Sequence, residues 1–308
     1  MRPKLLIPAL AGALLAMTGC DFEEFGNVGH YSRDFHYSYP LKSGGRVSVE
    51  TFNGSVEITP WDQDTVDISG TKYGPTQDAA DNLKVSIDNS PDSVSIRVSR
   101  PYERRNNQGA RFAIKVPRKA SVDRITTSNG AIRIQDTTGT ARLKTSNGSI
   151  RVQGLQGTLD AETSNGSVEL FEIDGDVSAH SSNGHIKADH IGGSFDATTS
   201  NSSVTAVLER PDRGVRVGTS NGSIDLTVPG NLHSDLHANT NNSSITLHFN
   251  GEPDAHVVAQ TSNGTITSDF DMKVRGEIRR NHMDAVLGGG GATIDLGTSN
   301  GNIRLLRR

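Results

Sequence analysis

The chain has 308 residues and a formal net charge of −4, with 33 Gly, only 5% aromatic residues and one Cys. This length suits one or two domains, and so small a net charge favours no particular class of partner. A single Cys excludes a framework of disulfide bonds within the chain. Patterns typical of long amphipathic helices are nearly absent, which agrees with an all-β fold.

Residues 1–19 have the pattern of a lipoprotein signal peptide. Two basic residues precede an apolar run, Leu5 to Ala16, that is short for a membrane span, and the run leads through Met-Thr-Gly to Cys20. Small residues directly before a Cys resemble the lipobox of bacterial lipoproteins. The resemblance implies that Cys20 carries lipid, that residues 1–19 are removed and that the new N-terminus is acylated. The alternative is an ordinary signal peptide or membrane anchor with an incidental Cys.

We therefore expect a protein of the cell envelope, outside the cytoplasm, that is held by lipid on the periplasmic face of the inner or outer membrane. Several acyl chains together anchor a protein stably. Asp21 follows the Cys, and by resemblance to enterobacterial lipoproteins it favours retention at the inner membrane. Residues 20–34 lack clear periodicity and are expected to form a tether.

Residues 35–119 are expected to form the first strands and a cap. Alternating aromatic residues predict a strand from Phe35 to Pro40, and Phe-Asn-Gly at Asn53 is the first copy of a corner that recurs later. A terminal unit of this kind covers the exposed core and the edge strand of a stacked fold. Within it the sequence predicts a short helix, Thr76 to Leu83, capped by Thr76, and strands near 65–72, 83–88, 93–99 and 111–117.

The rest of the chain is built on one repeated corner, Thr-Ser-Asn-Gly or a close variant. Its asparagine recurs at intervals of 18, 18, 18, 18, 20, 21, 21 and 37 residues. A fixed period near 20 residues is typical of a stacked repeat architecture. Asn-Gly favours positive φ, so each copy is expected to make a tight corner. The asparagines are Asn129, Asn147, Asn165, Asn183, Asn201, Asn221, Asn242, Asn263 and Asn300.

Apolar and polar residues alternate on both sides of each corner. In one copy the inward positions before the corner are Leu159, Ala161 and Thr163, and those after it are Val168 and Leu170. This period of two predicts two short, half-buried strands per repeat. One repeat cannot bury its apolar face alone, but stacked repeats share a narrow core, and their identical polar side chains would align as hydrogen-bonded ladders. The sequence therefore predicts an all-β, single-stranded β-solenoid of stacked 18–21-residue coils, with an irregular β-rich cap at its N-terminal end.

We expect the solenoid to span residues 120–308. Residues 269–291, which include a run of four Gly, interrupt the period and are expected to leave the stack as a loop or hairpin before the last rung, Ala292 to Leu305. With about ten rungs, each advancing roughly 4.8 Å, the column would be on the order of 50 Å long.

These residues resemble a known family. The segment from Val47 to Asp62, the serial Thr-Ser-Asn-Gly-Ser-Ile units and the stretch from Gly289 to Leu305 are similar to the bacterial β-strand-repeat envelope proteins grouped as "putative adhesin" domains of unknown function. The resemblance covers roughly residues 35–306. It implies a β-solenoid fold, and it brings no established activity with it.

No group of residues predicts catalysis, a metal site or a cofactor. Gly-x-Ser-x-Gly, the nucleophile elbow of hydrolases, occurs at Ser220 and Ser299, but that elbow joins a strand to a helix, and both copies are repeats of the corner. His180, His185 and His190 form the one histidine cluster worth testing as a zinc site. The third histidine is expected to point away from the other two, so surface histidines are the favoured interpretation.

Charge is distributed unevenly along the chain. From Arg97 to Arg151 there are 13 Lys and Arg against 3 acidic residues, whereas from Val152 to Met272 there are 4 against 16. A basic end could meet anionic glycans, lipid head groups or an acidic envelope protein; the alternative is a solvated face whose charges aid solubility. Nucleic acid is not expected as a partner. The candidate anion-binding residues are Arg124, Arg133, Arg142, Lys144 and Arg151.

Three functions remain open from the sequence. The favoured one is a lipid-anchored envelope protein whose solenoid is a rigid surface for adhesion, binding or scaffolding, without catalysis. The second is an enzyme acting on polysaccharides, which would need carboxylates converging in a groove. The third is a partner of a membrane protein in envelope stress or signalling, suggested by Asp21.

Overall fold

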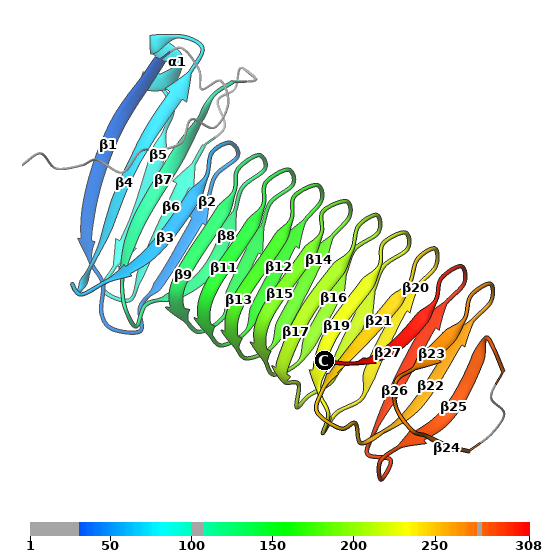
Figure 1. Cartoon of the computed structure of the whole chain (residues 1–308). Helices are drawn as coiled ribbons and strands as arrows, with labels where there is room; N and C mark the ends of the chain where they lie inside the picture. The colour runs from blue at the N-terminus through cyan, green and yellow to red at the C-terminus, as the bar shows by residue number, and fades with distance from the viewer. Residues whose placement is uncertain (1–30, 100–106, 276–278) are drawn as a thin grey trace, which may run out of the picture.

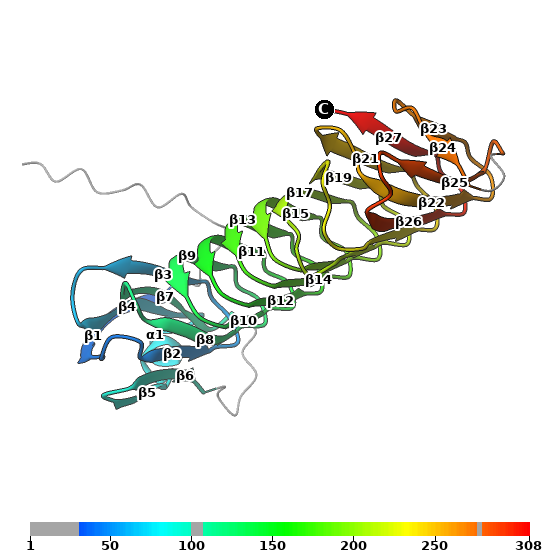
Figure 2. The ribbon, with the colours of Figure 1, turned by 90° about the horizontal axis from the view of Figure 1, so that it is seen from below.

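The computed structural model describes residues 31–99, 107–275 and 279–308; the segment predicted to be a signal peptide and Cys20 lie outside these ranges. The chain winds into a long column whose coils stack along one axis (Figure 1). Two walls of strands form the opposite sides of the column, as the view from below shows (Figure 2). The predicted all-β solenoid is confirmed.

Most strands of the two walls are parallel to their neighbours. In spatial order the first wall contains β5 (Val85–Ser90), β6 (Ser93–Val98), β2 (Arg46–Glu50), β8 (Ser121–Thr126), β10 (Ala141–Lys144), β12 (Leu159–Thr163), β14 (Val177–Ser181), β16 (Phe195–Thr198), β18 (Val215–Gly218), β20 (Leu236–Thr240), β26 (Ala292–Thr298), β22 (Ala255–Thr261), β25 (His282–Leu287) and β24 (Lys273–Val274). The second contains β1 (Tyr31–Pro40), β4 (Thr65–Gly74), β7 (Gly109–Pro117), β3 (Val56–Trp61), β9 (Ile132–Thr138), β11 (Ile150–Gln156), β13 (Val168–Asp174), β15 (Ile186–Gly192), β17 (Val204–Arg210), β19 (Ile224–Pro229), β21 (Ile245–Asn250), β27 (Ile303–Arg307) and β23 (Ile266–Ser268).

One coil shows how the sequence makes this fold. β12 turns at the Thr-Ser-Asn-Gly corner into β13, and a second turn at Gly175 leads to β14, which pairs with β12 in parallel and in register. Leu159, Ala161, Val168 and Leu170 are all completely buried, while the residues between them point outward. Because each inward side chain stacks on its counterpart in the next coil, the core is continuous along the column.

The corner glycines permit close stacking of the coils and, with one exception, do not have positive φ. Gly166 is not among the residues with positive φ. A Cβ on Gly166 would lie 1.8 Å from the carbonyl oxygen of Gly148 in the preceding coil. The expectation that Asn-Gly makes the corner through positive φ is therefore wrong here; Gly54, in the first copy, is the exception with a φ of 124°. Ser202 and Ser243 stand at this place in two corners, so a glycine is not required at every corner.

Left-handed backbone occurs at the opposite corner instead. Asp136, Glu172 and His190 have φ values of 45°, 57° and 58°, and Gly154 takes the same place with 69°. Residues other than glycine rarely adopt this conformation. Its recurrence every 18 residues therefore identifies a second corner in these coils, whose backbone conformation is imposed by the stacking of the coils. Three residues further on, a glycine with positive φ completes each turn: Gly139, Gly157, Gly175 and Gly193.

The first and last coils of the chain do not lie at the ends of the column. β2 and β3 lie between β6 and β7 on one side and β8 and β9 on the other. Likewise β26 and β27 lie between β20 and β21 on one side and β22 and β23 on the other. The rung from Ala292 to Leu305 is last in the sequence but not last in space, which corrects the sequence-based expectation.

The two ends of the column are covered by antiparallel strands. β25 pairs with β22 and with β24, so part of the expected excursion at 269–291 continues the first wall. At the other end β5 pairs with β6, β4 with β7, and β1 with β4. β1 begins at Tyr31, so residues 31–34 belong to a strand and not to the expected tether.

The predicted helix is present as α1 (Gln77–Asp81), two residues shorter at its end than expected. The side chain of Thr76 caps it by accepting a hydrogen bond from the N–H of Ala79 at 3.1 Å. Gln108 donates from its side chain to the carbonyl of Ala79 and is itself buried, which fixes the helix against the column. Nowhere in the described ranges is a helix long and apolar enough to cross a membrane.

Candidate binding surface

The asparagines of the corners form one row along an edge of the column. Asn165 donates its side-chain amide to the Oδ1 of Asn147 at 2.7 Å and accepts the amide of Asn183 at 2.8 Å. Since each inner member both donates and accepts, the row joins neighbouring coils. Its spatial order is Asn53, Asn129, Asn147, Asn165, Asn183, Asn201, Asn221, Asn242, Asn300 and Asn263.

Buried hydroxyl groups join the coils inside the same corners. Thr163 donates from Oγ1 to the carbonyl of Gly148 in the preceding coil at 3.0 Å, and it accepts the N–H of Gly166 in its own coil at 3.2 Å. Ser181 repeats both bonds in the next coil. Because these hydrogen bonds are shielded from water, they hold adjacent coils in a fixed relation. The outward side chains therefore project from a rigid backbone.

The five candidate anion-binding residues do not form one surface. Arg124, Arg142 and Lys144 lie on β8 and β10 in the first wall, whereas Arg133 and Arg151 lie on β9 and β11 in the second wall. The single basic patch expected from the sequence is thus divided between opposite sides of the column. Three of the five are also paired with carboxylates: Arg142 with Asp123 at 2.9 Å, Lys144 with Glu162 at 2.6 Å and Arg151 with Glu169 at 2.9 Å.

The motifs that resemble catalytic or metal sites lie at strand-to-strand corners and at surface positions of the solenoid. Ser220 and Ser299 lie in corners that lead from strand to strand, β18 to β19 and β26 to β27, with no helix after either. His180 bonds the hydroxyl of Thr198 at 2.8 Å. His185 and His190 each approach carboxylates, His185 that of Glu169 and His190 those of Asp189 and Glu209. Among the residues that the structure describes, no three His, Cys, Asp or Glu side chains gather as metal ligands would.

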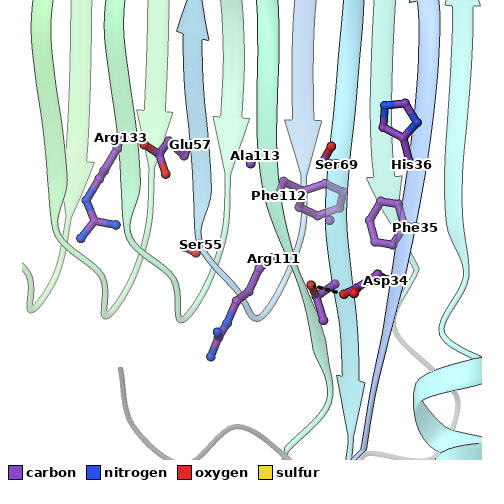
Figure 3. A pocket seen from close by; sticks show the side chains of 12 residues that line it. Asp34, Phe35, His36, Ser55, Glu57, Ser69, Arg111, Phe112, Ala113 and Arg133 are labelled. Atoms are coloured by element: carbon purple, nitrogen blue, oxygen red, sulfur yellow. Dashed lines mark hydrogen bonds between the residues drawn. The ribbon is translucent and has the colours of Figure 1, made fainter. Parts of the chain in front are cut away.

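A hollow of about 710 Å³ lies on the second wall near its N-terminal end, across β1, β4, β7, β3 and β9 (Figure 3). The strand register explains why there is space: Ser69 on β4 lies opposite Ala113 on β7, and both side chains are small. The lining residues are Asp34, Phe35, His36, Ser55, Glu57, Ser69, Gly70, Thr71, Arg111, Phe112, Ala113 and Arg133. We call this site the Arg111–Arg133 hollow.

Two strands carry the cations of the hollow, and a third strand lies between them. Arg111 is on β7 and Arg133 on β9, while Glu57 on β3 pairs in register with Arg133 on one side and with Ala113 on the other. Neither arginine forms an ion pair within the described ranges. This distinguishes them from Arg142 and Arg151, whose guanidinium groups already meet carboxylates.

Two other polar side chains of the hollow, those of Asp34 and His36, have hydrogen-bond partners on β4. Asp34 accepts a hydrogen bond from the hydroxyl of Thr71 at 2.7 Å. His36 lies 2.6 Å from Asp67, on strands that pair directly. The hollow thus presents guanidinium donors beside hydroxyl and carboxylate acceptors.

Aromatic rings lie beyond the hollow in both directions along β7. The Arg111 guanidinium lies 5.7 Å from the ring centre of Tyr73, and the Lys115 ammonium lies 5.7 Å from that of Trp61. A cation held over a ring keeps donors free for other partners. Burial raises the pKa of the Tyr73 phenol, and the nearby Arg111 charge offsets part of that rise.

The sequence predicts that Arg133 belongs to an anion-binding surface, but it does not single out Arg111. Arg111 lies in the aperiodic cap, and its approach to Arg133 depends on β3 entering between β7 and β9. One signal was available: Arg111, Ala113 and Lys115 alternate with buried residues along β7, which places all three on one outward face. The outward face of β7 could be predicted, but the strands that lie beside β7 could not.

Comparisons with known proteins give a family for the chain but no information about the Arg111–Arg133 hollow. The family model described as "Toastrack DUF4097" matches residues 45–306. No curated protein matches the chain. Among solved structures, a "putative cell adhesion protein" from Clostridium sporogenes is 10% identical with a TM-score of 0.24, covering 90% of this chain and 100% of the other. A "putative adhesin" from Bacteroides fragilis is 14% identical with a TM-score of 0.39, covering 89% and 97%. Likenesses this low support no conclusion about function.

Proposed function

The chain belongs to the Toastrack DUF4097 family, and from that premise we propose that it is a lipid-anchored protein of the cell envelope whose β-solenoid is a rigid surface for binding or scaffolding. In this proposal Cys20 carries the lipid, the solenoid stands outside the cytoplasm, and no reaction is catalysed. The lipid anchor rests on the sequence pattern around Cys20, which lies outside the described residues.

The observation that carries the proposal is the in-register stacking of outward side chains. Arg133, Arg151, Glu169 and Lys187 occupy equivalent places on four successive coils of the second wall. Adjacent parallel strands are about 4.8 Å apart, so these side chains form a straight, regularly spaced row. The core, the asparagine row and the buried hydroxyls hold the backbone beneath them. Such a surface suits recognition of an extended partner by many small contacts.

Fractionation of cells that produce the full chain tests the anchor. We expect the wild-type chain in the membrane fraction, labelled by a palmitate analogue, and the Cys20→Ser variant unlabelled and released from the membrane. A Cys20→Ser variant that stays firmly membrane-bound would contradict the lipid anchor.

Site-specific photocrosslinking in the same cells tests the surface. A photoreactive residue at Thr205, which points outward in the row that contains Lys187, should give a defined adduct with an envelope component. The same residue at Thr246, two coils further along the same row, should give an adduct with the same component, because the proposed partner extends along the row. If outward positions along both walls give no adduct, the binding surface is wrong. Breakdown of an acidic polysaccharide by the purified chain would contradict the absence of catalysis.

A further inference from the structure

We propose that the Arg111–Arg133 hollow binds an acidic oligosaccharide, with sugar carboxylates on the two arginines and sugar hydroxyls on the neighbouring acids. This rests on the proposed binding function and names the class of ligand for one site. It does not depend on how the chain is anchored.

The first argument is the availability of the two guanidinium groups. On the same column Arg118, Arg142 and Arg151 each meet a carboxylate within 3 Å, whereas Arg111 and Arg133 meet none in the described ranges. Arg124, Arg216 and Arg304 have no ion pair there either, but Arg111 and Arg133 line one hollow. Both are only partly exposed, so less solvent competes for them than for a fully exposed arginine. A planar guanidinium matches a carboxylate with two parallel hydrogen bonds. The unfilled donors therefore favour a ligand that carries carboxylates.

The second argument is the presence of acids beside those arginines. Glu57 lies between the strands of Arg111 and Arg133, and Asp34 uses a single known hydrogen bond, to Thr71. Glu57 and Asp34 repel any anionic ligand, so an acid at this place is expected only where the ligand also brings hydrogen-bond donors for it. Sugar hydroxyls donate well to carboxylates. A mixture of free cations and free acceptors thus fits a sugar acid better than a simple anion.

The third argument is the extension of the site by aromatic rings. Tyr73 pairs with Gly109 at one end of β7, and Trp61 pairs with Pro117 at the other. Eight residues of strand separate those positions, which is roughly 27 Å. Rings with one apolar face and one polar edge suit the C–H faces of sugars. The ligand is therefore a chain of several sugars that runs along the outward faces of β7 and β3, with its charged units in the hollow between Arg111 on β7 and Arg133 on β9.

Binding of a galacturonic acid hexamer to the full chain, purified in non-ionic detergent, tests the proposal by isothermal titration calorimetry. We expect the hexamer to bind and neutral maltohexaose not to bind. Arg111→Gln and Arg133→Gln should each weaken binding at least about tenfold, because each removes charge-assisted hydrogen bonds. Arg304→Gln is the matched control: Arg304 is exposed in the same row as Arg133 and Arg151, far along the column.

Three results would overturn the proposal: no binding of the hexamer at millimolar concentration, equal affinity of both arginine variants and wild type, or equal weakening by Arg304→Gln. Displacement of the hexamer by inorganic phosphate at lower concentration than by galacturonate would overturn the assignment to a sugar acid. Circular dichroism checks that each variant is folded. Arg133 lies on a regular coil, so its variant tests the site even if the Arg111 variant fails to fold. A negative result with intact membrane retention and crosslinking would leave the proposed function standing.

Discussion

Asn300 donates its side-chain amide to Asn242 at 2.9 Å although 58 residues separate them, and Asn263 donates to Asn300 at 2.8 Å. The last repeat of the chain therefore fills a place between two repeats that precede it. β2 and β3 are held in the same way near the other end of the column. Each terminal coil is thus paired on both sides, so neither is left as an exposed edge.

Truncation after Gly291 should unfold more than the segment that is removed. Without β26 and β27, β22 and β23 lose the strands that join them to the rest of the column. We expect amide hydrogens of residues 255–268 to lose protection from exchange, while those of residues 215–229 keep it. Hydrogen–deuterium exchange with mass spectrometry measures both.

The control for the truncation is Arg304→Gln, which keeps the inserted coil and changes only an outward side chain. This variant should keep the wild-type exchange pattern. If residues 255–268 stay protected after the truncation, the insertion of the last coil is wrong.

Thr163→Val should destabilise the column although the two side chains have nearly the same shape. The change removes the bond to the carbonyl of Gly148 and leaves the N–H of Gly166 without its acceptor, both at a corner where Thr163 is 1% exposed. Leaving buried polar groups unpaired costs about 2 kcal/mol. Urea denaturation gives the difference in free energy of unfolding.

Thr163→Ser is the matched variant, because Ser181 makes the same two bonds in the next coil. It should lose much less stability than Thr163→Val. Equal losses in both variants would show that the methyl group contributes as much to the corner as the two hydrogen bonds of the hydroxyl, which would contradict the expected difference.

Gly157→Ala should be among the most damaging small substitutions in the chain. Gly157 has a φ of 140°, and a Cβ there would lie 2.1 Å from the carbonyl oxygen of Gly139. Strain and overpacking together predict a loss of about 2 kcal/mol or more. At Gly218, in contrast, a Cβ would meet only a methyl group of Thr198 at 3.5 Å. Gly218→Ala should therefore stay close to the wild-type melting temperature, and similar losses at the two sites would contradict the close stacking.

Asp176→Asn should lower stability at neutral pH and have a decreasing effect in acid. Hydrogen bonds from the hydroxyl and the N–H of Ser194, at 2.7 and 3.1 Å, lower the pKa of the Asp176 carboxyl, and Arg213 adds to this. A lowered folded-state pKa stabilises the fold above the unfolded value, which is about 4. That contribution disappears as pH falls through the folded-state pKa. Urea midpoints of the two proteins should differ at pH 7 and converge as pH falls through the lowered folded-state pKa of Asp176; a constant difference would contradict the assignment.

Much of the fold could be predicted from the sequence because its causes are local. Alternation around Thr163 gave the inward positions, and the constant interval between asparagines indicated coils of equal length. The helix after Thr76 was visible from its cap. The corner conformation was predicted for the wrong reason, because the closeness of Gly166 to Gly148 is a property of two coils and not of one.

The order of the last coils and the composition of the hollow could not be predicted. The corners at Asn263 and Asn300 are nearly identical, so nothing in either shows which one follows Asn242 in space. Arg111 and Arg133 line the same hollow only because β3, which lies between their strands, pairs with two segments that come later in the chain. Because the segment between Asn53 and Asn129 does not contain the repeat, the repeat pattern cannot predict this pairing.

Distances between spin labels on the second wall test the column and its coil order most directly. In register, Arg151 is followed by Glu169, Lys187, Thr205, Asp225, Thr246, Arg304 and Thr267. In a chain with Cys20→Ser, we expect double electron–electron resonance to give about 29 Å for labels at Arg151 and Arg304, and about 34 Å for labels at Arg151 and Thr267. The reverse order would contradict the inserted coil, and two distances unrelated to the spacing of strands would contradict the solenoid itself.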